Sequence, residues 1–275
     1  MIDLHCHSYF SDGELSPSAL LQKAFDMGVR VLALTDHDTI EGLLPLHEAA
    51  LGKDITIING IELSVRWKKH DIHIIGLNIS LDDIGLKTLI ALQNDRRIER
   101  AHQIATSLLA CGIEDAYQKA CEIAGHARVG RPHFAQVLIN EGIVADMKSA
   151  FKRFLGAGRV AYAATAWISI EEAVAAIIDA KGDAVIAHPL KYSLTRSKLH
   201  ELIKFFKSAG GVGMEVVSGE MTVADANELA GLCSRFELFA STGSDYHGDR
   251  LSRKGLGQQR ELPVNCMPIW HQWTI

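Results

Sequence analysis

Short apolar runs in this sequence repeatedly end in histidine or carboxylate side chains, and this pattern constrains the fold most strongly. The first run, residues 2–4, leads directly into His5-Cys6-His7, and a second run, residues 31–34, is soon followed by His37. Alternate residues of an extended chain point the same way, so His5 and His7 can bind one metal ion from one side. The polar residues at the ends of the apolar runs are His5, His7, His37, Glu62, His188, Asp245 and His247.

Strand-like and helix-like segments alternate in the first and last thirds of the chain. Ser16-Pro17 predicts the start of a helix, and Thr39 is a candidate cap for the next one. Ser169 and Thr222 are candidate caps for two later helices. The apolar runs predict strands over residues 2–5, 31–35, 55–61, 72–77, 184–187, 213–217 and 238–241. This alternation favours an α/β fold with a mostly parallel sheet.

The alternation stops in the middle of the chain. Residues 82–122 are helical in pattern almost throughout, with a break at Gly112, and Pro132 begins a further helix. We expect the tail, residues 262–275, to pack over the bottom of the barrel or against a neighbour. The expected division is a barrel formed by residues 1–97 and 161–275 and an inserted helical cap formed by residues 98–160.

The composition excludes several classes of function. The formal net charge of −5 gives no basic field for wrapping long nucleic acid. The run Arg96, Arg97 and Arg100 is interpreted as a solvated helix face. No apolar run reaches the length of a membrane span, and the start of the chain shows no signal segment. Five cysteines without a Cys-x-x-Cys pair indicate a reduced, cytoplasmic protein.

The strand-end side chains would meet in a barrel, because the carboxyl ends of parallel barrel strands lie on one face. Asp12, in a Ser-Asp-Gly turn, and His73 join these candidates, with His70 as the alternative to His73. Imidazoles and carboxylates without cysteine suit Zn, Mn, Fe or Co. Nine ligands are too many for one ion, so we expect two or three ions with Glu62 as a bridging carboxylate. The nine candidates are His5, His7, Asp12, His37, Glu62, His73, His188, Asp245 and His247.

Other titratable residues are expected to have lesser roles. One of Asp36 and Asp38 is expected to orient a ligand imidazole, and the other to stabilise a turn. Glu215, at a predicted strand end, is given no role. The histidines on predicted helix faces or loops are not expected to be ligands, and they are His47, His102, His126, His200 and His271.

Five short motifs carry a family resemblance. In chain order they are DLHCHS at 3–8, TDHD at 35–38, GIE at 60–62, AHP at 187–189 and GSDYH at 243–247. Together they resemble the polymerase and histidinol phosphatase (PHP) family over essentially the whole chain. The resemblance implies a distorted (β/α)7 barrel with a two- or three-metal centre that hydrolyses phosphate esters. It also implies which residues hold which ion: His5 and His7 one metal, Asp12 and His37 a second, and His73 and His188 a third, with Glu62 bridging and Asp245 and His247 closing the site.

A further motif, Gly130-Arg131-Pro132-His133, is similar to one in a narrower branch of that family. That branch resembles phosphatases of 3′,5′-bisphosphonucleotides that also trim short oligonucleotides from the 5′ end. Arg131 at a helix start can fork onto a phosphate, with free backbone N–H groups beside it. A cap carrying Arg131, His133 and Arg128 over a metal centre could therefore hold a second phosphate, and Lys191 is another phosphate-binding candidate.

The implied reaction removes a terminal phosphate from a small nucleotide or short oligonucleotide by attack of a metal-bridged hydroxide, with Mn²⁺ as the expected ion. His188 or His247, or water on a metal, would protonate the leaving oxygen. All nine candidate ligands except His73 form the expected catalytic set. The alternatives are a histidinol-phosphate phosphatase, an amidohydrolase-type C–N hydrolase and a silent metal-binding module. The amidohydrolase alternative is weakened because this chain lacks a lysine at a strand end.

Overall fold

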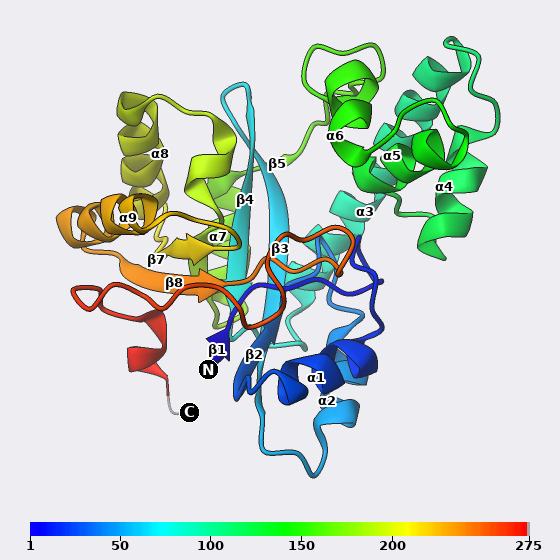
Figure 1. The fold of residues 1–275 in the computed structure, drawn as a ribbon. Helices are drawn as coiled ribbons and strands as arrows, with labels where there is room; N and C mark the ends of the chain where they lie inside the picture. The colour runs from blue at the N-terminus through cyan, green and yellow to red at the C-terminus, as the bar shows by residue number, and fades with distance from the viewer. Residues whose placement is uncertain (274–275) are drawn as a thin grey trace.

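A nearly closed barrel forms the centre of the molecule (Figure 1). The computed structural model describes residues 1–273. Neighbouring strands follow the order β1-β2-β3-β4-β6-β7-β8, and β5 (Ile168–Ser169) pairs with β3 outside this path. The barrel strands are β1 (Ile2–Asp3), β2 (Val31–Leu34), β3 (Thr56–Trp67), β4 (His70–Leu77), β6 (Asp183–Ile186), β7 (Gly213–Ser218) and β8 (Phe239–Gly243). The expected α/β barrel is confirmed.

Residues just after the first strand contact the last strand and the loop that follows it, and so nearly close the barrel. The amide of Leu4 donates to the carbonyl of Thr242 at 3.0 Å, and the amide of Asp245 donates to the carbonyl of His5 at 2.8 Å. Gly243 permits this approach, because a Cβ atom there would lie 2.3 Å from the Cβ of His5. The motif after the last strand is thereby placed beside the motif after the first.

One strand runs against the others. β4 pairs antiparallel with both β3 and β6, whereas the remaining pairs among the described strands are parallel. β3 and β4 are joined directly by Lys68 and Lys69, and Lys68 adopts a positive φ of 54°. Such a tight turn can only connect antiparallel strands. This hairpin carries His73 back toward the middle of β3, where Glu62 lies.

Helices lie around the barrel and in a second cluster beside it, and most begin where the sequence predicts. Ser16, Ser169 and Thr222 each accept a hydrogen bond from the amide three residues later, as expected of N-caps. The helices are α1 (Pro17–Asp26), α2 (Leu43–Ala50), α3 (Ile84–Leu109), α4 (Ala116–Ala124), α5 (Arg131–Asn140), α6 (Met147–Ala150), α7 (Ile170–Asp179), α8 (Arg196–Ser208) and α9 (Val223–Phe236). Short helical turns cover η1 (Phe151–Leu155), η2 (Pro189–Tyr192) and η3 (Ile269–Gln272).

The prediction that Thr39 caps α2 is wrong. Gly42 occupies the N-cap position of this helix. The Thr39 hydroxyl instead accepts from the amide of Glu41 at 3.3 Å, within a turn. The neighbouring Asp38 has a positive φ of 50° and donates its amide to the carbonyl of Glu62 at 2.9 Å. The residues between β2 and α2 are thus held against β3 in a non-helical conformation.

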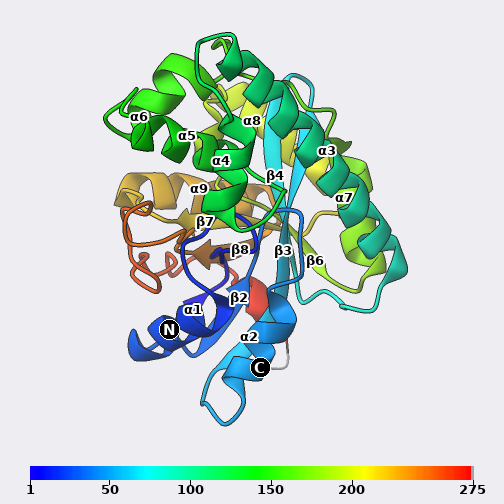
Figure 2. The same cartoon turned by 90° about the vertical axis from the view of Figure 1, so that its right-hand side faces the viewer.

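A single helix connects the barrel to a second cluster of helices. The first half of α3 buries Leu86 and Ile90 in the barrel core, and its second half buries Ile104 and Leu108 in a separate core with α4 and α5. Figures 1 and 2 show α4, α5 and α6 gathered at the far end of α3. The domain boundaries at residues 98 and 160 remain a prediction.

The tail covers the bottom of the barrel, as expected, over its described part. Ile269 is fully buried in a cluster that includes Leu4, Ile75 and Val185. The indole of Trp273 donates to Asp183 at 2.7 Å. Within residues 1–273, none of the helices combines the length and apolar character that crossing a membrane requires.

Replacing Ile269 by Ala should destabilise the protein by about 2–5 kcal/mol, because the change leaves a cavity in the closed end of the barrel. Chemical unfolding followed by circular dichroism measures this. Val264→Ala in the same tail is the control and should change stability by less than about 0.5 kcal/mol, because Val264 is fully exposed. Equal stability of the two variants would show that the tail is not part of the core.

Candidate metal centre and active site

The Glu62 carboxylate lies at the centre of the polar cluster. It projects from β3 and is fully buried. Its Oε1 atom lies 2.9 Å from the nearest nitrogens of two imidazoles, and its Oε2 atom lies 3.0–3.3 Å from those of three more. The five imidazoles are those of His73 and His188 around Oε1 and those of His5, His7 and His37 around Oε2.

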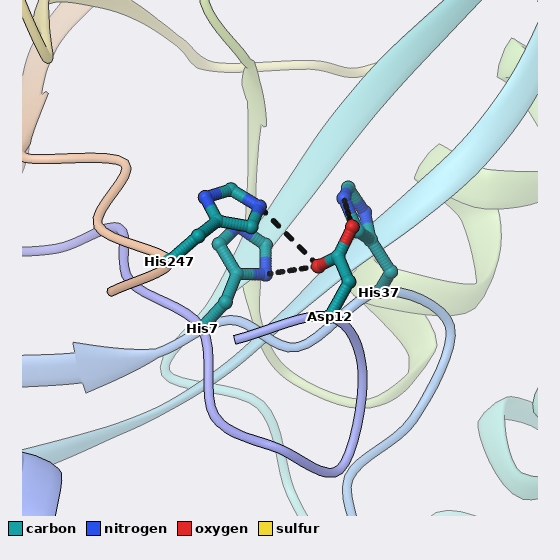
Figure 3. Close-up of side chains that lie close together, drawn as sticks. All are labelled: His7, Asp12, His37 and His247. Carbon is teal, nitrogen blue, oxygen red and sulfur yellow. Dashed lines mark ion pairs between the residues drawn. The ribbon is translucent and has the colours of Figure 1, made fainter. Parts of the chain in front are cut away.

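The Asp12 carboxylate lies among a second group of imidazoles beside Glu62. One of its oxygens lies 3.9 Å from His7 Nδ1 and 3.3 Å from His247 Nε2. Its other oxygen lies 3.8 Å from His37 Nε2. Figure 3 shows the Asp12 carboxylate between these rings, with His7 and His247 on one side and His37 on the other.

Asp245 completes the cluster from the loop after β8. Its Oδ1 atom lies 3.3 Å from His5 Nε2 and 3.5 Å from His7 Nε2. Its other oxygen forms an ion pair with Lys191. Asp245 adopts a positive φ of 52° and His188 one of 24°. Such conformations cost free energy in residues other than glycine and often occur at functional sites.

The donor atoms form overlapping groups, each able to hold one ion. Within each group the ligand atoms lie within 4.8 Å of one another. The rival candidate His70 lies at the start of β4, beside Trp67, outside these groups. The groups are His7, Asp12, His37 and His247; His5, His7 and Asp245; His5, Glu62 and His188; and His37, Glu62 and His73.

Two observations test whether these residues fit metal ions. Glu62 Oε2 and His37 Nδ1 are buried 3.0 Å apart, yet neither has a hydrogen-bond partner among the described residues. The Nε2 atoms of His5 and His7 face each other at 3.1 Å. Metal–nitrogen bonds of about 2.0–2.1 Å would allow both nitrogens to bind the same ion. The donor set therefore fits divalent ions. The role of each residue as a ligand remains a prediction.

The charges of the cluster are strongly coupled. Burial alone would raise the pKa of Glu62, but His37, His5 and His73 hold it well below its usual value. Burial lowers the pKa of His37 to about 4, which keeps this imidazole neutral. For these two residues, the neutral imidazole and the ionised carboxylate are the forms that bind metal.

Glu215, left without a role from the sequence, orients two residues of the cluster. Its Oε1 atom lies 2.9 Å from His5 Nδ1, and its Oε2 atom accepts from the amide of His188 at 2.6 Å. Glu215 is fully buried in β7. A carboxylate within an apolar strand was the available signal, because a buried charge needs partners.

Asp36 and Asp38 hold loops, and neither hydrogen-bonds a ligand imidazole among the described residues. Asp36 accepts from the amide and hydroxyl of Ser8 at 2.7 and 2.6 Å and from the hydroxyl of Ser11 at 2.7 Å. These bonds fix the turn that carries Asp12. Asp38 instead accepts from Arg97 Nε at 2.7 Å.

The prediction of a solvated Arg96–Arg100 face is wrong for two of its three arginines. Arg97 and Arg100 each expose only 7% of their surface. Both guanidiniums lie over the Trp167 ring, with Cζ 5.3 and 4.9 Å from its centroid. The partner residues Asp38 and Trp167 are distant in the sequence, so the local charge pattern could not reveal this burial.

These arginines line a cavity of about 150 Å³ next to the metal cluster, together with His37, His73 and Arg131. We call it the arginine pocket. Arg100 and Arg131 form no ion pair with any described carboxylate, and Arg100 Nε lacks a hydrogen-bond partner there. Burial, then the charges of Arg97 and Arg131, lower the pKa of Arg100 to about 9.

The four expected substrate-binding residues have different surroundings. Arg131 lines the arginine pocket with its Cζ 5.8 Å from the Phe151 ring centroid. His133 is 8% exposed, and burial lowers its pKa to about 4. Arg128 forms a two-point ion pair with Glu41. Lys191 is paired with Asp245 at the metal cluster. Their roles in substrate binding remain predictions.

The PHP domain model matches residues 3–219, which include the first seven of the nine candidate ligands in chain order. The chain belongs to the PHP family. Two PHP relatives are each 39% identical to it. One is the 3′,5′-nucleoside bisphosphate phosphatase of Chromobacterium violaceum, aligned over 98% of this chain and 95% of the relative. The other is a 5′-3′ exoribonuclease of Haemophilus influenzae, aligned over 98% of both.

Solved structures agree with this PHP fold. An amidohydrolase from Chromobacterium violaceum, solved with bound sulfate and no metal, superposes with a TM-score of 0.94 at 39% identity over 98% of this chain and 94% of that one. A putative metal-dependent phosphoesterase from Bifidobacterium adolescentis superposes with a TM-score of 0.85 at 25% identity over 96% and 93%. The expected PHP-type barrel is confirmed.

Replacing Glu215 by Gln should weaken metal binding by roughly 10–100-fold, because His5 loses the carboxylate that orients it. Metal content after dialysis, measured by mass spectrometry, tests this without any activity assay. Glu220→Gln is the matched control, since Glu220 pairs with Arg253 at the surface. Unchanged metal content in the Glu215 variant would contradict the orienting role.

Proposed function

We propose that this chain is a metal-dependent phosphoesterase that removes a terminal phosphate from 3′,5′-bisphosphonucleotides, such as adenosine 3′,5′-bisphosphate, and also trims short oligonucleotides from the 5′ end. PHP membership and the names of the two relatives support the reaction class. The observation that carries the substrate assignment is the arginine pocket, which places unpaired positive charge beside the metal cluster.

The nine candidate ligands would hold two or three ions, and we propose Mn²⁺, with Zn²⁺, Fe²⁺ and Co²⁺ as alternatives that suit the same donors. Bound there, the ions would supply Lewis acidity and an activated water to a phosphate ester. The protein's part is to fix the donor atoms. Glu62 would serve as the bridging carboxylate, which is supported by its two oxygens facing different sets of imidazoles.

The arginine pocket is suited to a second phosphate. A buried guanidinium without a carboxylate partner is unfavourable, and a bound anion relieves this cost. Arg97 is already neutralised by Asp38. The pocket also contains the carboxylates of Asp71, which pairs with Arg66, and of Asp12, which faces the imidazoles of the cluster. Arg100 and Arg131 are the guanidiniums there without an ion-pair partner among the described residues. Their planar guanidiniums can each offer two N–H groups to phosphate oxygens. His37 and His73 line the same pocket, so both phosphates of one nucleotide could bind at once.

Lys191 and two histidines have proposed roles in phosphate binding and in protonation of the leaving group. The Lys191 ammonium lies against Asp245, at the edge of the metal cluster, where it can also contact a phosphate oxygen. His188 and His247 are the candidates for protonating the leaving oxygen. The cytoplasmic location of the enzyme remains a prediction from the sequence.

Histidinol-phosphate phosphatase remains the alternative with the same chemistry. Its substrate carries one phosphate and a cationic amine, which two unpaired arginines would repel. A bisphosphonucleotide supplies the second anion that this pocket lacks.

Replacing Arg100 by Met should lower kcat/KM for adenosine 3′,5′-bisphosphate by roughly 10–100-fold, because a charge-assisted hydrogen bond contributes about 1.5–3 kcal/mol. Phosphate release with Mn²⁺ would be measured for this substrate, for adenosine monophosphates and for histidinol phosphate. The ratio of bisphosphate to monophosphate activity should fall toward one.

Arg96→Met on the same helix is the matched control, because Arg96 lies outside the residues that line the pocket. If kcat/KM of the wild-type enzyme is the same for the bisphosphate and the monophosphates, the pocket does not bind a second phosphate. The enzyme would then be a general phosphoesterase. Preference for histidinol phosphate would refute the nucleotide assignment.

Replacing Asp245 by Asn should reduce turnover by at least about 10³-fold while the fold is retained, because the carboxylate contacts both His5 and His7. Circular dichroism would verify the fold, and metal analysis would show whether an ion is lost. Normal turnover with normal metal content would contradict the proposed centre.

A further inference from the structure

A second cavity lies next to Asp12. Its volume is about 360 Å³, and residues from the Asp12 turn, from α4 and α5, and from the loop after β8 line it. Asp12 and Pro132 line both this cavity and the arginine pocket. A ligand with its phosphates at the metal cluster and the arginine pocket could therefore extend into this space, which we call the α5 cavity.

His133 presents a hydrogen-bond donor to the α5 cavity. Its Nδ1 atom accepts from the amide of Gly130 at 2.9 Å, so its ring proton must reside on Nε2. Among the described residues no hydrogen bond is made by this Nε2 atom, and it does not belong to the fully buried polar atoms, so it is open to a ligand. The side chain is more than nine-tenths buried and lines the cavity. An accessible donor on a cavity wall can bind a ligand that supplies an acceptor.

Two amide side chains on the same face of α5 add a matched donor and acceptor. Gln136 Nε2 donates to Asn140 Oδ1 at 2.7 Å. This bond leaves the carbonyl oxygen of Gln136 and the amino group of Asn140 free. Adjacent acceptor and donor groups match the edge of a nucleobase, on which donors and acceptors also lie side by side.

The remaining walls suit a flat, uncharged ring. Ile123, Met147 and Leu251 contribute apolar surface, and Tyr9 contributes an aromatic ring that is 43% exposed. Bases stack on such surfaces in single-stranded nucleic acid complexes. The one arginine at the cavity, Arg250, is paired with Glu14 at 2.7 Å. Unlike the arginine pocket, this cavity therefore has no unpaired arginine to attract a phosphate.

We infer that the α5 cavity binds the nucleobase of the nucleotide, or of the 5′-terminal residue of a short oligonucleotide, through His133, Gln136 and Asn140. This inference rests on the proposed function. It assigns separate recognition of phosphate and base to the two cavities on either side of Asp12.

The test compares 2′-deoxyadenosine 3′,5′-bisphosphate with an abasic analogue, 1,2-dideoxyribose 3,5-bisphosphate, which differs from it only in lacking the base. The KM of the wild-type enzyme with Mn²⁺ should be at least roughly tenfold higher for the abasic compound. The hydrogen-bonding groups of the α5 cavity stay unpaired when no base is bound. In Gln136→Leu, the ratio of the abasic KM to the nucleotide KM should fall by roughly tenfold.

Gln118→Leu is the matched control, because the side-chain amide of Gln118 likewise donates to the residue four positions later, here the carboxylate of Glu122, on the exposed face of α4. It should keep the wild-type ratio. Equal KM values for both substrates in the wild type, or an unchanged ratio in Gln136→Leu, overturn the base site and leave the phosphatase intact. If the wild-type enzyme hydrolyses neither substrate, the proposed function is overturned, and this inference with it.

Discussion

The buried carboxylate of Glu62, in contact with five imidazoles, organises this molecule. An ionised carboxylate without compensation would be very unfavourable at this depth. The imidazoles come from four separate strands or the loops that follow them. The negative charge of Glu62 is therefore compensated only when these strands are assembled into the barrel. The hairpin of β3 and β4 and the contact of β8 with β1 both serve this arrangement.

Positive and negative regions lie side by side at the active face. The metal cluster gathers three carboxylates, whereas the arginine pocket contains two guanidiniums, those of Arg100 and Arg131, without an ion-pair partner among the described residues. His37 and His73 line the boundary between them. A molecule that carries two phosphates, one for the metal ions and one for the arginines, would satisfy both regions together.

The sequence predicted the parts of this structure that depend on local patterns. The caps at Ser16 and Thr222 and the polar residues that end the strands were recognisable because neighbouring residues define them. The reversed direction of β4 was missed, because an apolar run has no direction. The burial of Arg97 was missed because its partner, Asp38, lies 59 residues away in the chain. The role of Glu215 was also hidden, since it depends on two other strands.

The continuity of α3 limits how the two cores can move. One helix of 26 residues passes from the barrel to the second core, and Gln93 and Arg97 attach it to Ser64 and Asp38. Arg100 follows one turn later on the same rigid rod. The separation between the guanidinium of Arg100 and the carboxylate of Glu62 is therefore set by the attachment of this helix to the barrel. Such an enzyme would select its substrates by length, accepting those whose two anionic ends are the right distance apart.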